Sequence, residues 1–170
     1  MRKFTWLFLF ALLGVLNSAQ AELGHRLLPA LGVNAATDYE SVVASDGSGL
    51  PLGSGSVIVG KEIYGTQCAA CHGLDGRMRS NALAGGEGTL ASTNALKTVG
   101  SYWPYATTLF DYIQRAMPYG NEKSLSDDQV FAVTAYVLHM NGLLAADARL
   151  TAATLVEIRM PNQQGFRPAP

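Results

Sequence analysis

The segment Cys68-Ala69-Ala70-Cys71-His72 contains both cysteines of this 170-residue chain. Three kinds of site use cysteines at this spacing. A thiol–disulfide redox pair needs a strand before it, whereas the residues before Cys68 have the pattern of a helix. Half of a zinc site needs two further ligands, and the other histidines, His25 and His139, do not form a spaced pair. Cys-x-x-Cys-His is the signature of covalent c-type haem attachment, which is the interpretation that we favour.

In haem attachment, the two cysteines and the histidine of this motif have separate roles. One turn of helix brings the Cys68 and Cys71 thiols to the two haem vinyl groups, and the adjacent His72 imidazole then binds the iron from one side. We therefore expect one covalent haem c, bound through Cys68, Cys71 and His72.

The second face of the iron needs another ligand, for which methionine and histidine are candidates. Met117 lies in Arg115-Ala116-Met117-Pro118-Tyr119-Gly120 and follows His72 by 117 − 72 = 45 residues, enough chain to wrap a haem. Because a helix tends to end before proline, Met117 can turn its sulfur inward. We expect Met117 as the distal ligand and His139 as the alternative. The other methionines of the mature chain are less suitable: Met78, Met140 and Met160.

The first 21 residues have the three parts of a secretory signal peptide. Arg2 and Lys3 are basic, Phe4–Leu16 is almost entirely apolar, and small residues precede a cleavage site after Ala21. The apolar run is shorter than the ~20 residues that span a bilayer. Cleavage removes these two basic residues and lowers the formal net charge from −1 to −3. We expect a periplasmic protein with no transmembrane anchor after cleavage.

The composition excludes several classes of protein. With 48% hydrophobic and 15% charged residues, the chain is globular rather than disordered. A net charge near zero does not supply the basic surface of a nucleic-acid-binding protein.

The mature chain is expected to be all-α, with helices wrapped around one haem. Residues 22–56 form an N-terminal arm rich in glycine and serine, 57–158 form the haem domain, and 159–170 form a proline-containing tail. Glycine-rich loops over 73–100 wrap the haem. The run Tyr102-Trp103-Pro104-Tyr105 places three aromatics at its entrance, where they hold propionates or belong to an ordinary core.

Four helices are expected within the haem domain, over 57–68, 104–116, 126–141 and 150–158. Ser56 can cap the first helix, and Ser126-Asp127-Asp128-Gln129 is a capping box. Apolar side chains recur at helical spacing on each long helix. These stripes comprise Val59, Ile63 and Cys68 on the first; Leu109, Ile113 and Ala116 on the second; and Val130, Val133, Val137 and Met140 on the third.

This order of elements resembles a class I cytochrome c. In that family an N-terminal helix ends in Cys-x-x-Cys-His, loops wrap the haem, a methionine binds the iron, and a C-terminal helix crosses the first. Gly60 and Tyr64 are similar to the glycine–aromatic contact of the family, with Tyr136 as the partner on the last helix.

Longer stretches between about residues 45 and 166 resemble the cytochrome subunits of Sox-type sulfane dehydrogenase and of periplasmic sulfite dehydrogenase. The resemblance implies that the chain accepts electrons from a molybdenum-cofactor enzyme that oxidises a reduced sulfur compound. A downstream cytochrome or oxidase would then receive these electrons. Because the chain has a single Cys-x-x-Cys-His, it resembles a one-haem version of these cytochrome subunits. The matching stretches are 46–51, 53–57, 85–90, 97–108, 110–113 and 160–162.

The expected function is single-electron transfer, without substrate chemistry by the protein itself. If Met117 does not bind the iron, the alternative is a haem enzyme or a gas- or peroxide-binding protein. The sequence leaves open whether the chain is a free carrier or a fixed subunit that contacts its partner through the arm or through 102–108.

Overall fold

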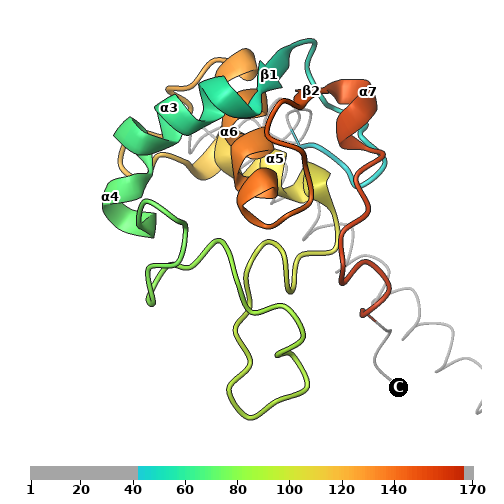
Figure 1. The fold of residues 1–170 in the computed structure, drawn as a ribbon. Helices are drawn as coiled ribbons and strands as arrows, with labels where there is room; N and C mark the ends of the chain where they lie inside the picture. The colour runs from blue at the N-terminus through green and yellow to red at the C-terminus, as the bar shows by residue number, and fades with distance from the viewer. Residues whose placement is uncertain (1–41, 167–170) are drawn as a thin grey trace, which may run out of the picture. The chain divides into compact units, whose positions relative to one another are not determined.

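The computed structural model describes residues 42–166, so the predicted signal peptide and residues 22–41 of the predicted arm lie outside the described residues. One compact unit begins at Val43. Its helices are α3 (Val57–Gln67), α4 (Ala69–His72), α5 (Ala106–Ala116), α6 (Asp127–Met140) and α7 (Ala152–Leu155), and its strands are β1 (Ser54–Ser56) and β2 (Arg149–Thr151) (Figure 1). None of the helices in this part of the chain is long and apolar enough to cross a membrane.

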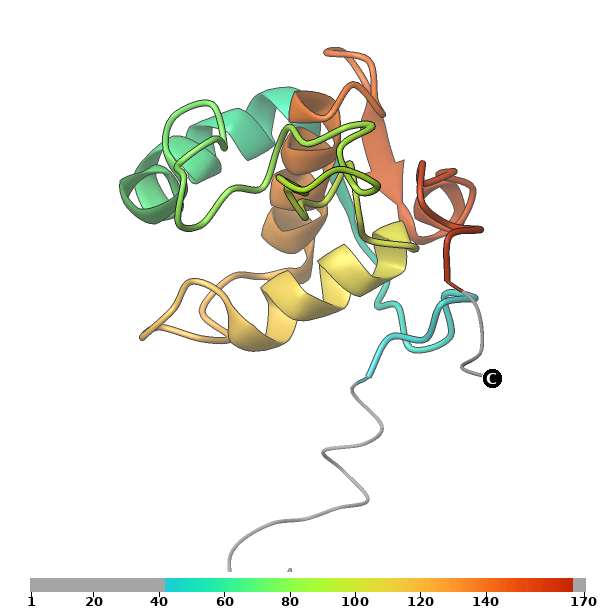
Figure 2. The same ribbon diagram turned by 90° about the horizontal axis from the view of Figure 1, so that it is seen from below.

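Helix α6 is the centre of the core. Every residue from Val130 to Leu138 is buried, and Figure 2 shows α6 between α3 and α5. Helix α3 meets α6 at Gly60, where an added Cβ would lie 1.8 Å from the Ala132 carbonyl oxygen. Only glycine allows two backbones to approach this closely. On α5, the Phe110 ring packs against Phe131 with the centroids 4.5 Å apart.

The predicted helix caps are present. The Ser56 hydroxyl accepts the Val59 N–H at 3.3 Å, and Ser126 and Gln129 form the reciprocal capping box of α6. The predicted start of the second helix is wrong by two residues. Helix α5 begins at Ala106, because Tyr105 has the extended backbone of an N-cap residue, with φ −137° and ψ 137°.

Two further sequence expectations need correction. The buried face of α3 consists of Val57, Gly60 and Tyr64, and Val59 is 46% exposed. The contact with α6 is centred on Gly60, which turns Val59 toward solvent, whereas Ile63 and Cys68 of the expected stripe remain partly buried against the core. The helix expected over 150–158 is replaced by β2 and the short α7, because residues 149–151 pair antiparallel with β1. The all-α prediction thus holds for the helices, with one small two-stranded sheet added.

The described part of the predicted N-terminal arm begins against α5 and ends in β1, which packs on α6. Val43 is buried in the core, and its N–H donates to the Asp111 carboxylate at 3.1 Å. Arg115 binds the same carboxylate, with Nε and Oδ1 2.9 Å apart. This pairing raises the pKa of Arg115 above its ordinary value, chiefly through the hydrogen bond to Asp111.

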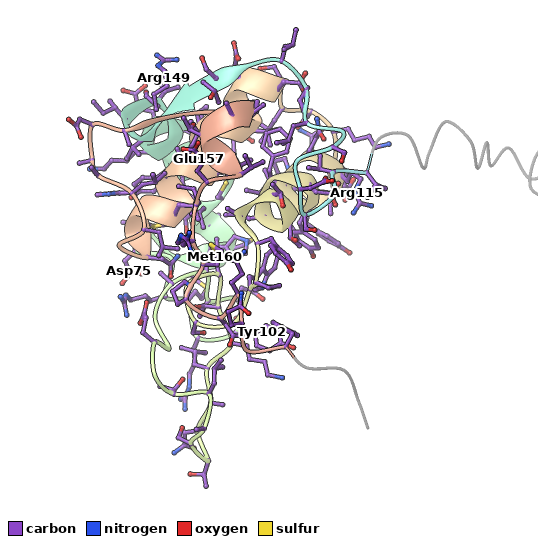
Figure 3. All side chains as sticks on the ribbon, turned by 90° about the vertical axis from the view of Figure 1, so that its right-hand side faces the viewer. Asp75, Tyr102, Arg115, Arg149, Glu157 and Met160 are labelled. Carbon is purple, nitrogen blue, oxygen red and sulfur yellow. The ribbon has the colours of Figure 1, made fainter. Side chains whose placement is uncertain are left out.

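The described part of the predicted C-terminal tail also packs on the helical unit. Met160, which the sequence placed in a tail, is 3% exposed and belongs to the core (Figure 3). The Asn162 side-chain amide donates to the Tyr102 carbonyl oxygen at 2.8 Å, and Phe166 packs edge-on against the Tyr102 ring. These contacts fix the segment that leads into α5.

Candidate haem-binding site

A cavity of about 340 Å³ lies among α3, α4, α5, α6 and the loops that follow α4 and α5. Its wall is largely apolar and aromatic, with Leu83, Leu109 and Val133 among the residues that line it. None of the described residues on this wall is Asp, Glu, Lys or Arg. Size and lining are those of a site for an apolar cofactor.

The structure brings together all four residues predicted to bind the haem, since Cys68, Cys71, His72 and Met117 line this one cavity. Cys68 lies at the junction of α3 and α4. Its carbonyl oxygen accepts the N–H groups of Cys71 and His72 at 3.1 and 3.0 Å. A single helical turn therefore presents two thiols and an imidazole to the same space.

The two cysteines differ in their surroundings. Cys71 is exposed and Cys68 is partly buried, and the two do not form a disulfide. Burial, and secondarily the neighbouring Cys71, raises the pKa of the Cys68 thiol to about 11. Burial therefore favours the neutral form of the Cys68 sulfur.

The orientation of His72 is set by the backbone of Asn81. The imidazole Nδ1 lies 2.7 Å from the Asn81 carbonyl oxygen. A carbonyl only accepts hydrogen bonds, so Nδ1 carries a proton, and in the neutral imidazole Nε2 then keeps its lone pair. A histidine that ligates a metal is typically held in this way by a backbone or carboxylate oxygen. The Asn81 side chain also donates to the Cys71 carbonyl oxygen at 3.4 Å.

Met117 lies where the sequence analysis expected α5 to end. It is the C-cap residue, with an extended backbone at φ −127° and ψ 149°, and its N–H donates to the Ile113 carbonyl oxygen at 3.1 Å. The next two residues, Pro118 and Tyr119, also line the cavity. The Met–Pro sequence thus ends the helix at the cavity wall.

These residues fit a covalently attached haem. Two thiols, an imidazole with its Nε2 lone pair and a thioether line one apolar cavity, which is the donor set of a His/Met c-type site. The zinc alternative lacks support within residues 42–166, where no three His, Cys, Asp or Glu side chains are grouped to hold a metal. A redox pair is also disfavoured, because helix α3 precedes Cys68.

The other candidate iron ligands do not line the cavity. The His139 Nδ1 forms a 2.9 Å hydrogen bond with the Leu144 carbonyl oxygen. Met78 is 41% exposed, Met140 packs beside Gly76, and Met160 is buried in the core.

Only Trp103 of the three aromatics predicted at the entrance lines the cavity. It packs edge-on against Tyr112, with ring centroids 5.8 Å apart. Tyr102 instead lies under the Lys97 ammonium, 4.8 Å from the ring centroid. The sequence did not predict three other residues of this site: Asn81, Tyr112 and Tyr119. The Asn81 contact uses a backbone carbonyl, which every residue has, so it leaves no sequence signal.

The family model for cytochrome c matches residues 57–141, which is half of the chain, and the chain therefore belongs to the cytochrome c family. The match begins at the first residue of α3 and ends just after α6. It includes all four predicted haem-binding residues. Membership of this family implies a covalently bound haem c and a role in electron transfer.

Two similar proteins are named for sulfur chemistry. The chain is 34% identical over 89 residues to a thiosulfate dehydrogenase of Stutzerimonas stutzeri (strain A1501), a match that covers 51% of this chain and 28% of that protein. It is similar to the crystal structure of the sulfane dehydrogenase SoxCD from Paracoccus pantotrophus, with 41% identity and a TM-score of 0.75. That match covers 78% of this chain and 66% of the other. The chain thus spans only part of each relative.

Proposed function

We propose that this chain is a one-haem electron carrier that accepts electrons from a molybdenum-cofactor sulfite or sulfane dehydrogenase. It would pass them to a downstream cytochrome or oxidase of the respiratory chain. The observation that carries the proposal is the convergence of Cys68, Cys71, His72 and Met117 on one uncharged cavity. The similarity to thiosulfate and sulfane dehydrogenases supports a partner that oxidises a reduced sulfur compound.

Each residue of the site has a distinct task in this proposal. The Cys68 and Cys71 thiols hold the haem covalently, and His72 Nε2 and Met117 Sδ bind its iron. When bound, the haem supplies a one-electron Fe(III)/Fe(II) couple. His/Met ligation favours a high reduction potential, which suits an acceptor. The apolar wall excludes water from the iron, and the Asn81 carbonyl oxygen holds the imidazole in the tautomer that can ligate.

We further propose export to the periplasm, with residues 1–21 removed as a signal peptide. The arm 22–56, the haem domain 57–158 and the tail 159–170 are proposed as the divisions of the chain. Electron transfer between a periplasmic dehydrogenase and the respiratory chain requires this location. Mass spectrometry of the exported protein should find Glu22 at its N-terminus.

The ligand set is tested by spectroscopy of the haem-loaded protein. A pyridine haemochrome of c type, with one haem per chain, is expected. The ferric protein should show the weak long-wavelength band of methionine ligation, and Met117→Ala should abolish it. Met78→Ala is the matched control, because Met78 does not line the cavity. If the band survives in Met117→Ala, another residue binds the iron. A high-spin wild-type spectrum with rapid carbon monoxide binding would instead indicate an open distal site.

The partner is tested by co-purification and reduction. A molybdenum-cofactor dehydrogenase that co-elutes with the chain should reduce its haem when sulfite is added. A complex that survives gel filtration would identify a fixed subunit. A monomer whose reduction depends steeply on salt would identify a free carrier, since the weaker encounters of free redox proteins are steered by charge. Failure of any sulfur-compound dehydrogenase to reduce the haem would contradict the proposed donor.

A further inference from the structure

Tyr64 carries a hydroxyl group that helix packing does not require. The residue is 1% exposed and lines the cavity. Its ring packs edge-on against Tyr136 of α6, with centroids 5.2 Å apart and planes at 61°. A phenylalanine would make the same contact between α3 and α6. The hydroxyl instead donates a 2.9 Å hydrogen bond to the carbonyl oxygen of Gly73.

Gly73 is the point where the chain turns from α4 into the following loop. This loop contains Asn81, whose carbonyl oxygen binds the His72 imidazole. Gly73 directly follows His72 and has φ 80°, in the region that favours glycine. Its N–H donates to the Ala69 carbonyl oxygen at 2.8 Å, which closes α4. The direction of the Gly73 peptide therefore sets the path of the loop toward Asn81, whose carbonyl oxygen accepts from the His72 imidazole.

His72 is thus anchored at two points. The Asn81 carbonyl oxygen holds the ring, and the bond between Tyr64 and Gly73 holds the backbone directly after it. The second anchor connects the haem-binding turn to the close contact between α3 and α6, because Tyr64 and Gly60 lie on the same buried face of α3. Hydrogen bonds of this kind orient metal ligands and tune the metal that they bind.

We propose that Tyr64 is a positioning residue, whose hydroxyl fixes the Gly73 peptide and through it the plane of the His72 imidazole at the haem iron. This inference rests on the proposed ligation of the iron by His72. Burial raises the pKa of Tyr64 above its ordinary value, so the hydroxyl keeps its proton at neutral pH and remains a donor.

The test compares Tyr64→Phe with Tyr136→Phe in the haem-loaded protein. Each variant keeps the aromatic pair and removes one hydroxyl. Within the described residues, the Tyr136 hydroxyl makes no hydrogen bond to the haem-binding turn, which makes it a matched control. The readouts are the hyperfine-shifted haem methyl resonances and the EPR g values of the ferric protein, which report the orientation of the axial ligand planes, and the midpoint potential.

We expect Tyr64→Phe to shift the haem methyl pattern and the midpoint potential, and Tyr136→Phe to leave both as in the wild type. Unchanged values in Tyr64→Phe, or equal changes in both variants, would overturn the inference. Should Tyr64→Phe fail to load haem, the wild type gives an independent measurement. Its Tyr64 hydroxyl proton should be a slowly exchanging NMR resonance, and rapid exchange with water overturns the inference. A wild-type spectrum without low-spin His/Met ligation would contradict the proposed function itself, so the two failures are distinguishable.

Discussion

The two regions that adjoin α6 are built in different ways. Where α3 and α5 cross it, the contact is made by the chain alone, with Phe131 fully buried and the Gly60 backbone against Ala132. At the cavity, α6 contributes Val133 and Val137 to a wall that it shares with loops. Tyr119 on that wall is 89% exposed.

The comparison separates the part of the core that the chain completes by itself from the part that a cofactor would complete. The helix crossing buries apolar side chains against one another, so it is stable by ordinary packing. The cavity wall comes from segments far apart in the sequence, and a flat apolar cofactor would join them. We therefore expect the stability of the helix crossing to depend on the volume of its side chains. The stability of the cavity side should depend on the bound haem.

The largest expected effect is that of removing both covalent attachments. The double substitution Cys68→Ser and Cys71→Ser should yield a chain without covalent haem that has lost its cooperative unfolding transition. Without the cofactor, the loop segments gain too little burial to offset their conformational entropy. Near-UV circular dichroism and urea denaturation measure this. A sharp transition with the wild-type midpoint would show that the cavity side needs no haem.

The next largest effect is expected at the helix crossing. Gly60→Ala should destabilise the haem-loaded protein by about 3 kcal/mol, because the new methyl group meets the Ala132 backbone and separates the helices. The matched control is Gly65→Ala on the same helix, where an added Cβ meets nothing within 4 Å. That variant should stabilise the protein by about 0.5–1 kcal/mol, since glycine is unfavourable within a helix. Denaturant titration distinguishes the two, and equal effects would contradict the close contact.

The helix crossing was largely predictable from the sequence, because its signals are local. The capping box at Ser126 follows from the local residue pattern, and the spacing of Val130, Val133 and Val137 follows from helical periodicity. The pairing of Tyr64 with Tyr136 was implied by the resemblance to class I cytochromes c. The error at Val59 arose because two faces of α3 are apolar, and periodicity alone does not decide which one meets α6. Strand β2 was missed because its partner, β1, lies about a hundred residues earlier in the sequence.

The candidate site was predictable only in part. Cys68, Cys71 and His72 carry a motif, and Met117 is marked by the proline that follows it. Asn81 acts through its backbone, and Trp103 could not be distinguished from its aromatic neighbours without knowing how the loop folds. Such contacts depend on loop closure rather than on residue type, so a single sequence does not specify them.

A smaller effect is expected where the N-terminal arm meets α5. Asp111→Asn keeps an acceptor for the Val43 N–H but removes the charge that pairs with Arg115. We expect a loss of about 1–3 kcal/mol in the free energy of unfolding, since the carboxylate is buried. Asp46→Asn, at an exposed carboxylate, is the control and should have little effect.

The pH dependence of this contact follows from the raised pKa of Arg115. A base whose pKa is raised in the folded state contributes its full stability below its unfolded pKa and loses it only as the pH rises above that pKa, which for arginine lies far above neutral. The Arg115 contribution should therefore not change between pH ~7 and ~10. Denaturation of the wild type and Asp111→Asn across this range measures the difference between them. A difference that shrinks as pH rises would mean that Arg115 does not supply the stabilising charge.

The smallest expected effects compare the caps of the two helices that cross. Ser126→Ala should destabilise the protein by about 1 kcal/mol, because it removes one half of the reciprocal capping box of α6. Ser56→Ala removes a single 3.3 Å bond at the start of α3 and should cost less, with the haem spectrum unchanged. Thermal unfolding of both variants ranks them. If the Ser56 variant is the less stable of the two, the start of α3 contributes more to the stability of the helix crossing than the start of α6. The stability of the crossing would then depend mainly on α3, the helix that leads to Cys68.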